Sequence, residues 1–192
     1  YLRKALENNE ISNYGENLFL FEKELENYLG GKHHVTATVS GTSAIHLALI
    51  LAGVENNDEV ICQSFTFAAT ANPILYLRAV PVFIDSCEDN FNMCPIQLES
   101  AIKDSLINGK KPKAVIVVHS FGMPAKMDKI ITVCEKYKIK LIEDAAAALG
   151  AKYKGRKCGT LGDYGIFSFN GNKIITTGGG GALVCKAKED KN

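Results

Sequence analysis

Residues 114–144 of the chain read AVIVVHSFGMPAKMDKIITVCEKYKIKLIED, and this stretch decides the fold. Its first five residues, 114–118, are an apolar run typical of a strand buried on both faces. Residues 127–137 carry apolar side chains at helical spacing, and residues 140–143 are a short extended segment that ends on an acidic residue. Strand, helix and strand in this order predict two parallel strands whose connecting helix covers the sheet.

The same alternation of helix and strand runs through most of the chain. We expect helices at 18–28, 42–52 and 66–77 and a further one that begins at Pro95, with strands at 35–39, 59–63, 80–84, 165–169 and 182–185. Beyond residue 150 the order changes to glycine-rich turns and short strands. We therefore predict one α/β domain over residues 1–192, with a mostly parallel sheet flanked by helices on both faces.

The composition is that of a globular protein and excludes several classes of function. Of the 192 residues, 46% are apolar and 22% are charged. Lys and Arg total 22 against 21 for Asp and Glu, so no basic excess favours binding to nucleic acid. No apolar run approaches the roughly 18 residues of a membrane span, and the first residues lack the apolar stretch of a secretory signal. We expect a cytoplasmic protein with no nucleic-acid or membrane partner.

Six cysteines are scattered along the chain without a CxxC pair or a histidine at ligand spacing, so we expect reduced thiols and no metal site. The chain begins without Met and ends on a charged tail. We expect it to be a piece of a longer protein.

Polar residues follow two of the predicted strands, at the sheet edge where α/β proteins bind ligands. Ser40, Gly41, Thr42 and Ser43 open a helix whose first N–H groups could bind a phosphate, although residues of this kind are more often simple helix caps. Asp144 ends the strand at 140–143, where a buried carboxylate needs a cation; here too a helix cap is an alternative.

Two other residues near these strand ends are weaker candidates. Glu143 is turned to the opposite face of the sheet by strand alternation. His119 follows the strand at 114–118, and we expect it to line a pocket at most.

Lys173 lies in the least ordinary segment of the chain, GIFSFNGNKIITTGGGG at 165–181. Ile174 and Ile175 follow it, and Phe167 and Phe169 precede it, so we expect apolar surroundings that lower its pKa and free a nucleophilic amine. The four glycines at 178–181 permit close approach of the backbone to a ligand, although glycine runs are more often simple loops. The signatures of dinucleotide-binding and P-loop sites are both missing from the sequence.

Together these candidates match the needs of one cofactor, pyridoxal phosphate. Its phosphate fits Gly41, Thr42 and Ser43, with the Ser168 hydroxyl as a further donor. Its ring nitrogen needs a carboxylate such as Asp144, and its aldehyde needs a lysine such as Lys173. Phe67 offers an aromatic face on which the ring could stack.

The sequence also resembles the DegT/DnrJ/EryC1/StrS family of sugar aminotransferases, which have the type I aspartate-aminotransferase fold. The resemblance rests on Phe21-Glu22 with Gly30, SGTSA at 40–44, TFAATAN at 66–72, VFID at 82–85, HSFG at 119–122, IEDAA at 142–146, FSFNGNK at 167–173 and TTGGGG at 176–181. Within the family it looks most like the enzymes that aminate 4-keto nucleotide sugars toward bacillosamine- or legionaminic-acid-type sugars.

The resemblance implies a role for each matching residue. Lys173 bonds the cofactor and moves the substrate proton, Asp144 pairs with the ring nitrogen, and Phe67 stacks on the ring. Thr42, Ser43 and Ser168 hold the phosphate. L-Glutamate would donate the amino group to a 4-keto-6-deoxy nucleotide sugar, in the synthesis of surface-polysaccharide or glycan amino sugars. The family also implies a homodimer.

The chain departs from the family pattern in two ways. Ala147 stands where the family has His, Gln or Glu, three residues after the aspartate. The family is also about twice this length, so a smaller C-terminal domain is absent from this chain. One alternative is therefore a catalytically silent module that binds cofactor or assembles with other chains. The other is a sugar dehydratase of the same fold, although that branch has His at the position of Lys173.

Overall fold

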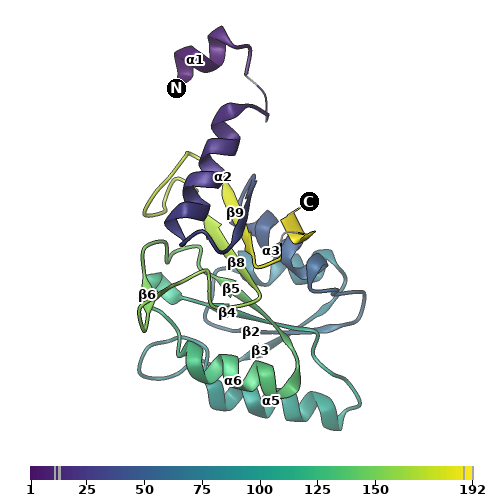
Figure 1. The fold of residues 1–192 in the computed structure, drawn as a ribbon. Helices are drawn as coiled ribbons and strands as arrows, with labels where there is room; N and C mark the ends of the chain where they lie inside the picture. The colour runs from purple at the N-terminus through teal and green to yellow at the C-terminus, as the bar shows by residue number, and fades with distance from the viewer. Residues whose placement is uncertain (11, 13, 188, 192) are drawn as a thin grey trace.

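A seven-stranded sheet in the order β1-β9-β8-β5-β4-β2-β3 runs through the computed structural model (Figure 1). The structure describes residues 1–192 except 11, 13, 188 and 192. The sheet strands are β1 (His34–Thr38), β2 (Glu59–Gln63), β3 (Val80–Ile84), β4 (Ala114–Val118), β5 (Lys140–Asp144), β8 (Tyr164–Ser168) and β9 (Gly181–Cys185). The short strands β6 (Lys152–Tyr153) and β7 (Arg156–Lys157) pair only with each other.

Helices connect most of these strands. They are α1 (Leu2–Glu7), α2 (Glu16–Tyr28), α3 (Gly41–Leu51), α4 (Asn72–Tyr76), α5 (Pro95–Ile107) and α6 (Met127–Tyr137), with 3-10 turns η1 (Ala68–Thr70), η2 (Ser120–Gly122) and η3 (Glu189–Lys191). Figure 1 shows α1 at one end of the molecule, away from the sheet.

The sheet is mostly parallel, as predicted. The pairs β3–β2, β2–β4, β4–β5 and β5–β8 are parallel, and β9 runs antiparallel to both of its neighbours, β1 and β8. In the register, Val118 of β4 lies opposite Asp144 of β5, which lies opposite Ile166 of β8. The carboxyl ends of three neighbouring strands therefore meet at one edge.

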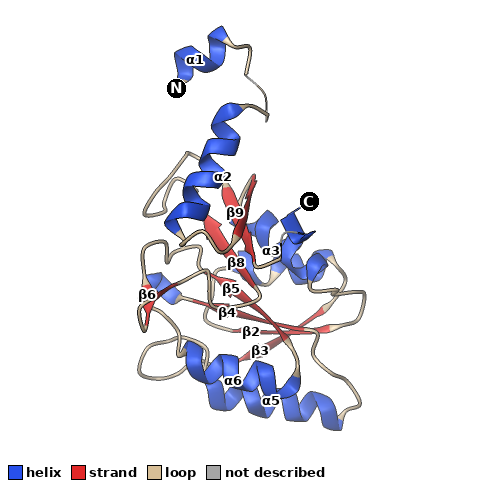
Figure 2. Ribbon diagram, in the orientation of Figure 1, coloured by secondary structure: helices blue, strands red, loops and turns tan. Residues whose placement is uncertain are grey.

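Strand alternation divides the core into two layers. On one face, Ile61, Val115 and Leu141 pack with buried side chains of α2, α5 and α6. On the other face, Val60 and Ile142 pack with α3 and α4. Figure 2 shows α5 and α6 together on their side of the strands. Helices on both faces are the arrangement that the sequence predicts.

The predicted helix at 66–77 is wrong in detail. The chain forms η1 and then a separate helix, α4, in which Pro73 occupies the first turn. Proline has no N–H to donate and its ring clashes with the preceding turn, so it is tolerated at a helix start and disfavoured within one. The sequence analysis also missed α1 and the β6–β7 hairpin.

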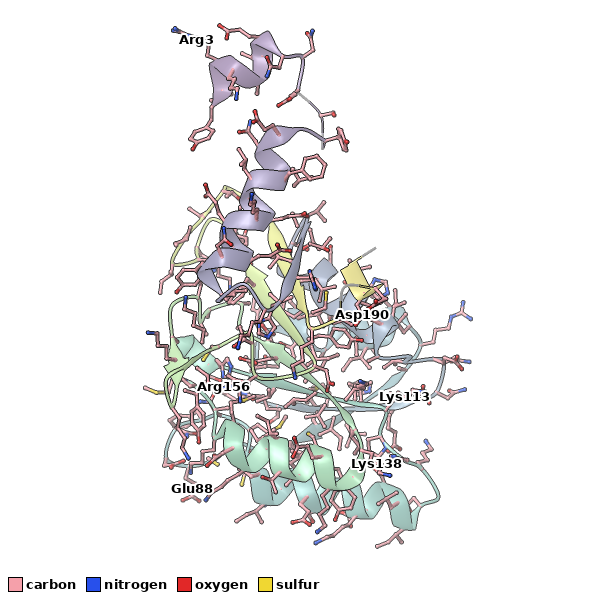
Figure 3. The ribbon with its side chains drawn as sticks, in the orientation of Figure 1. Arg3, Glu88, Lys113, Lys138, Arg156 and Asp190 are labelled. Atoms are coloured by element: carbon pink, nitrogen blue, oxygen red, sulfur yellow. The ribbon has the colours of Figure 1, made fainter. Side chains whose placement is uncertain are left out.

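The charged groups are spread over the molecule. In Figure 3, Arg3 lies on α1 at one end, and Glu88 and Lys138 lie toward the other, near α5 and α6. Among the described residues, no helix combines the length and the apolar character needed to cross a membrane.

Candidate active site

A cavity of ≈ 820 Å³ opens where β4, β5 and β8 end and α3 begins. Six of the seven predicted site residues line it: Gly41, Thr42, Phe67, Asp144, Ser168 and Lys173. They come from segments more than 130 residues apart in sequence, which the parallel sheet brings to one edge. The seventh, Ser43, is not among the lining residues, because it lies inside the first turn of α3 and bonds to Ser40.

Ser40 caps the helix that reaches the cavity. Its Oγ accepts a hydrogen bond from the Ser43 N–H at 3.1 Å and lies 3.0 Å from the Ser43 Oγ. In an α-helix the first N–H groups have no carbonyl partner, so those of Gly41 and Thr42 remain for a ligand. The positive end of the helix dipole is at the same place. The capping interpretation is confirmed for Ser40, whereas the N–H groups of Gly41 and Thr42 stay predicted to bind an anion.

Close packing fixes Ser168 beside this helix start. A Cβ added to Gly41 would lie 3.0 Å from the Ser168 Cβ, and one added to Gly181 would lie 2.3 Å from the Ser40 carbonyl carbon. Only glycine fits at Gly181, because the clash is with rigid backbone. The hydroxyl of Ser168 is thereby held next to the free N–H groups of α3, and the group forms a cradle suited to a phosphate.

Asp144 lies at the base of the cavity and is only 5% exposed. Its Oδ2 accepts a hydrogen bond from the Thr70 Oγ1 at 2.8 Å, and its Oδ1 accepts one from the Ala146 N–H at 3.1 Å. Burial raises the pKa of Asp144, while these two hydrogen bonds and the charge of Lys173 act to lower it. A carboxylate in this position is stabilised by a cationic group placed in the cavity.

Lys173 lies in the loop between β8 and β9 and lines the same cavity. Its charge is close enough to act on Asp144. The apolar surroundings predicted for it are not formed by its neighbours, because Ile174 and Ile175 are 75% and 56% exposed. Ile174 borders the open cavity, and neither isoleucine is buried in the core. The prediction from sequence adjacency was wrong on this point.

Phe67 stands at the cavity rim and is 80% exposed. Its carbonyl oxygen accepts a hydrogen bond from the Thr70 N–H at 3.0 Å, which ties it to η1. Phe121, 91% exposed, is a second aromatic residue of the lining. The rim therefore offers aromatic faces to a planar ligand.

Behind the cavity, Glu143 is fully buried and accepts four hydrogen bonds. Its Oε1 accepts from the His119 Nε2 at 2.9 Å and from the Gly159 N–H, and its Oε2 accepts from the N–H groups of Leu161 and Gly162 at 2.8 and 3.0 Å. Glu143 thus holds the loop that precedes β8. It lies on the opposite face of β5 from Asp144, as the sequence predicts. His119 lines the cavity and bonds to Glu143, which agrees with the pocket-lining role predicted for it.

His119, Glu143 and Cys158 are close enough together to suggest a metal site. The His119 Nδ1 already accepts the Ala125 N–H at 3.1 Å, and both oxygens of Glu143 are occupied by donors. The group is therefore complete without an ion, and the other described residues form no cluster of this kind.

The sequence analysis missed Thr70, which contacts Asp144 directly, and Thr66, which bonds to Thr70. No helical spacing marks the pair, because Thr66 precedes η1, and the contact of Thr70 with Asp144 joins residues far apart in sequence. Ala147, the departure from the family pattern, also lines the cavity, with a methyl group where a polar side chain was expected.

Comparisons with known proteins agree with this geometry. The sequence profile of the DegT/DnrJ/EryC1/StrS aminotransferase family matches residues 1–192. EpsN of Bacillus subtilis (strain 168), named for a pyridoxal phosphate-dependent aminotransferase activity, is 54% identical over 96% of this chain and 47% of its own length. GDP-perosamine synthase of Caulobacter vibrioides is 41% identical over 96% of this chain and 48% of its own length.

Solved structures give the same result. A DegT DnrJ EryC1 StrS aminotransferase from Brucella abortus superposes with a TM-score of 0.93 at 36% identity, over 98% of this chain and 51% of that one. The chain spans about half the length of the relatives that it matches.

Proposed function

Because the chain belongs to the DegT/DnrJ/EryC1/StrS aminotransferase family, we propose that it binds pyridoxal phosphate and forms the cofactor-binding part of a sugar aminotransferase. The observation that carries this proposal is the shared cavity of Asp144 and Lys173. A carboxylate and an amine line the same cavity, next to the start of a helix, and these are the groups that this cofactor needs.

The residues present fit the cofactor. The cradle of Gly41, Thr42 and Ser168 suits its phosphate, with Ser43 acting through the cap that shapes the helix start. Among the described residues, no cationic side chain forms an ion pair with Asp144, which leaves this carboxylate for a protonated ring nitrogen. Phe67 would lie against the ring face.

Each residue would have a defined task. Pyridoxal phosphate, when bound, supplies an electron sink for the carbon that loses its proton. Asp144 holds a proton on the ring nitrogen through a charge-assisted hydrogen bond. Lys173 bonds the cofactor through its Nζ and, once that amine is free, accepts the proton of the substrate carbon and returns it. The cradle fixes the orientation in which this transfer takes place.

We propose L-glutamate as the amino donor and a 4-keto-6-deoxy nucleotide sugar as the acceptor. The named relatives support a sugar substrate, since one is a GDP-perosamine synthase. Both substrates are anionic, and Lys173 is the sole Lys or Arg among the described residues that line the cavity. We propose that a partner subunit brings further cations to the site.

A homodimer would supply such groups and cover the rim. Val39, Phe67 and Phe121 line the cavity and are each at least 80% exposed. Apolar groups gathered in this way at a rim favour a covering partner. We also propose a cytoplasmic location, which fits the absence of disulfide bonds among the six cysteines, all of which lie in the described part of the chain.

The cofactor proposal is tested by adding pyridoxal phosphate to the chain, reducing with borohydride, and mapping the modified peptide by mass spectrometry. We expect the label on Lys173, with none on Lys173→Ala and full labelling of Lys129→Ala, which alters an exposed lysine on α6. Labelling spread over surface lysines would contradict a specific site.

Amino transfer to 4-keto sugars carried by UDP, GDP or dTDP then separates an enzyme from a silent module, the alternative that Ala147 raises. Labelled protein without transfer, in the chain extended to the length of its relatives, would favour the silent module.

A further inference from the structure

Two threonines and Asp144 form a continuous chain of hydrogen bonds. The Thr66 and Thr70 hydroxyl oxygens are 2.7 Å apart, and the Thr70 hydroxyl donates to the Asp144 Oδ2 at 2.8 Å. Both threonines line the cavity, and Thr70 is only 1% exposed. These hydrogen bonds therefore link Thr66 through Thr70 to the carboxylate along the cavity wall.

The direction of these hydrogen bonds follows from the number of protons. An ionised carboxylate only accepts, so Thr70 must donate its single hydroxyl proton to Asp144. The Thr66 hydroxyl must then donate to the Thr70 oxygen. Donation along a chain polarises each hydroxyl and strengthens the last bond, which is the one to the carboxylate.

Few other groups stabilise the charge of Asp144. The Ala146 N–H bonds to the other carboxylate oxygen, and Lys173 acts on the carboxylate only through its charge. Among the described residues, neither Lys173 nor the His119 side chain forms an ion pair or a hydrogen bond with the Asp144 carboxylate; the His119 backbone N–H donates to the Asp144 carbonyl oxygen at 3.1 Å. Thr70 is thus the one side chain that donates a hydrogen bond to this carboxylate among the described residues.

We propose that Thr70, supported by Thr66, is a positioning residue that keeps Asp144 ionised and directed into the cavity. Resting on the proposed function, this role makes the hydroxyl chain a determinant of how firmly the cofactor's ring nitrogen keeps its proton. In this role Thr70 acts through Asp144.

The test compares Thr70→Val, which keeps the shape and removes the hydroxyl, with Thr70→Ser, which keeps the hydroxyl. The first measurement is the titration of the Asp144 carboxyl by carbon NMR in the ligand-free chain, assigned with Asp144→Asn. We expect the titration to move to higher pH in Thr70→Val and to return toward the wild-type position in Thr70→Ser.

The second measurement is the dissociation constant of pyridoxal phosphate. A hydrogen bond to a charged group corresponds to roughly a tenfold to hundredfold change in an equilibrium constant, so binding should weaken by about that factor in Thr70→Val. The absorbance of bound cofactor should also show a ring nitrogen that loses its proton at lower pH.

Thr160→Val is the matched control. Thr160 is also buried, and its hydroxyl donates to the Lys157 carbonyl oxygen at 2.6 Å and not to Asp144. It should destabilise the fold without moving the Asp144 titration. Should Thr70→Val fail to fold, Thr66→Val takes its place, with a smaller shift in the same direction.

An Asp144 titration that stays at the wild-type pH in Thr70→Val, or in Thr66→Val if that variant is needed, would overturn the proposal. Equal shifts in Thr70→Ser and Thr70→Val would overturn it as well, because the hydroxyl would then not be the cause. Since the titration needs no cofactor, failure of the proposed function would show separately, as wild-type chain that binds no pyridoxal phosphate.

Discussion

Glu143→Gln should be among the most destabilising conservative changes in this chain. Both carboxylate oxygens of Glu143 are buried and each accepts two hydrogen bonds, from donors on two separate segments. Glutamine replaces one of the two oxygens with an NH₂ group, which only donates. Whichever way the amide is turned, it faces two donors that it cannot bond.

The arrangement around the side chain prevents a simple repair. If the NH₂ group faces His119 and Gly159, the imidazole cannot offer a lone pair at Nε2, because its Nδ1 already accepts the Ala125 N–H. If it faces Leu161 and Gly162, two backbone N–H groups lose their acceptor. Each buried unsatisfied group costs about 1–3 kcal/mol, so a loss of about 3–5 kcal/mol is expected. That is a large part of the 5–15 kcal/mol by which domains are typically stable.

Urea unfolding followed by circular dichroism measures this loss at constant m-value. The matched control is Glu99→Gln, which removes a carboxylate that bonds Lys136 and Tyr137 at the surface at 2.6 and 3.1 Å. There water can replace the partners, so only a small change is expected. If Glu143→Gln were no more destabilising than Glu99→Gln, the account of Glu143 as the acceptor that holds the loop before β8 would be wrong.

Three further predictions concern other parts of the chain. Asp144→Asn should raise the urea midpoint of the ligand-free chain at pH 7. Burial raises the pKa of Asp144 in the folded chain, so the wild type loses stability as pH rises above the unfolded-state pKa of about 3.9. The difference in urea midpoint between variant and wild type should therefore vanish near pH 3. A thiol reagent should modify the half-buried Cys87 and Cys94 in the native chain and leave the four buried cysteines unmodified until urea is added, which mass spectrometry of the labelled peptides would check. Gly181→Ala should weaken pyridoxal phosphate binding by displacing the start of α3, whereas Gly171→Ala, with only an ordinary contact at 3.9 Å, should bind as the wild type does in the same titration.

The regular part of the fold could be predicted because periodicity is a local property of the sequence. The apolar run of β4 and the amphipathic helix α6 have the bounds that the sequence predicts. The helix predicted at 66–77 was wrong because Pro73 confines α-helical structure to the residues from the start of α4 onward. The helix α1 was missed because it buries no residue, so no apolar face marks it in the sequence. The antiparallel place of β9 between β1 and β8 is set by pairing across the sheet, which no local pattern encodes.

The site was predictable to the extent that strand ends and helix starts are predictable. Gly41, Asp144 and Ser168 each lie where a strand ends or a helix begins, and a parallel sheet must bring such positions together. The surroundings of Lys173 were not predictable in this way, because a loop can turn adjacent apolar residues outward. Thr70 was missed because its contact with Asp144 joins residues 74 positions apart.

Glu143 and Asp144 together show how one strand end serves both stability and binding. Alternation sends the two carboxylates to opposite faces of β5. Glu143 meets four donors and is complete within the fold, whereas Asp144 meets only two and is buried beside an open cavity. The charge that the fold leaves under-compensated is therefore the one that faces the ligand, so binding of a cationic ring would relieve a cost that the ligand-free chain carries. Removing the charge of Asp144 should stabilise the ligand-free chain and abolish binding of pyridoxal phosphate in the cavity. Removing the charge of Glu143 should not stabilise the chain and should not abolish this binding.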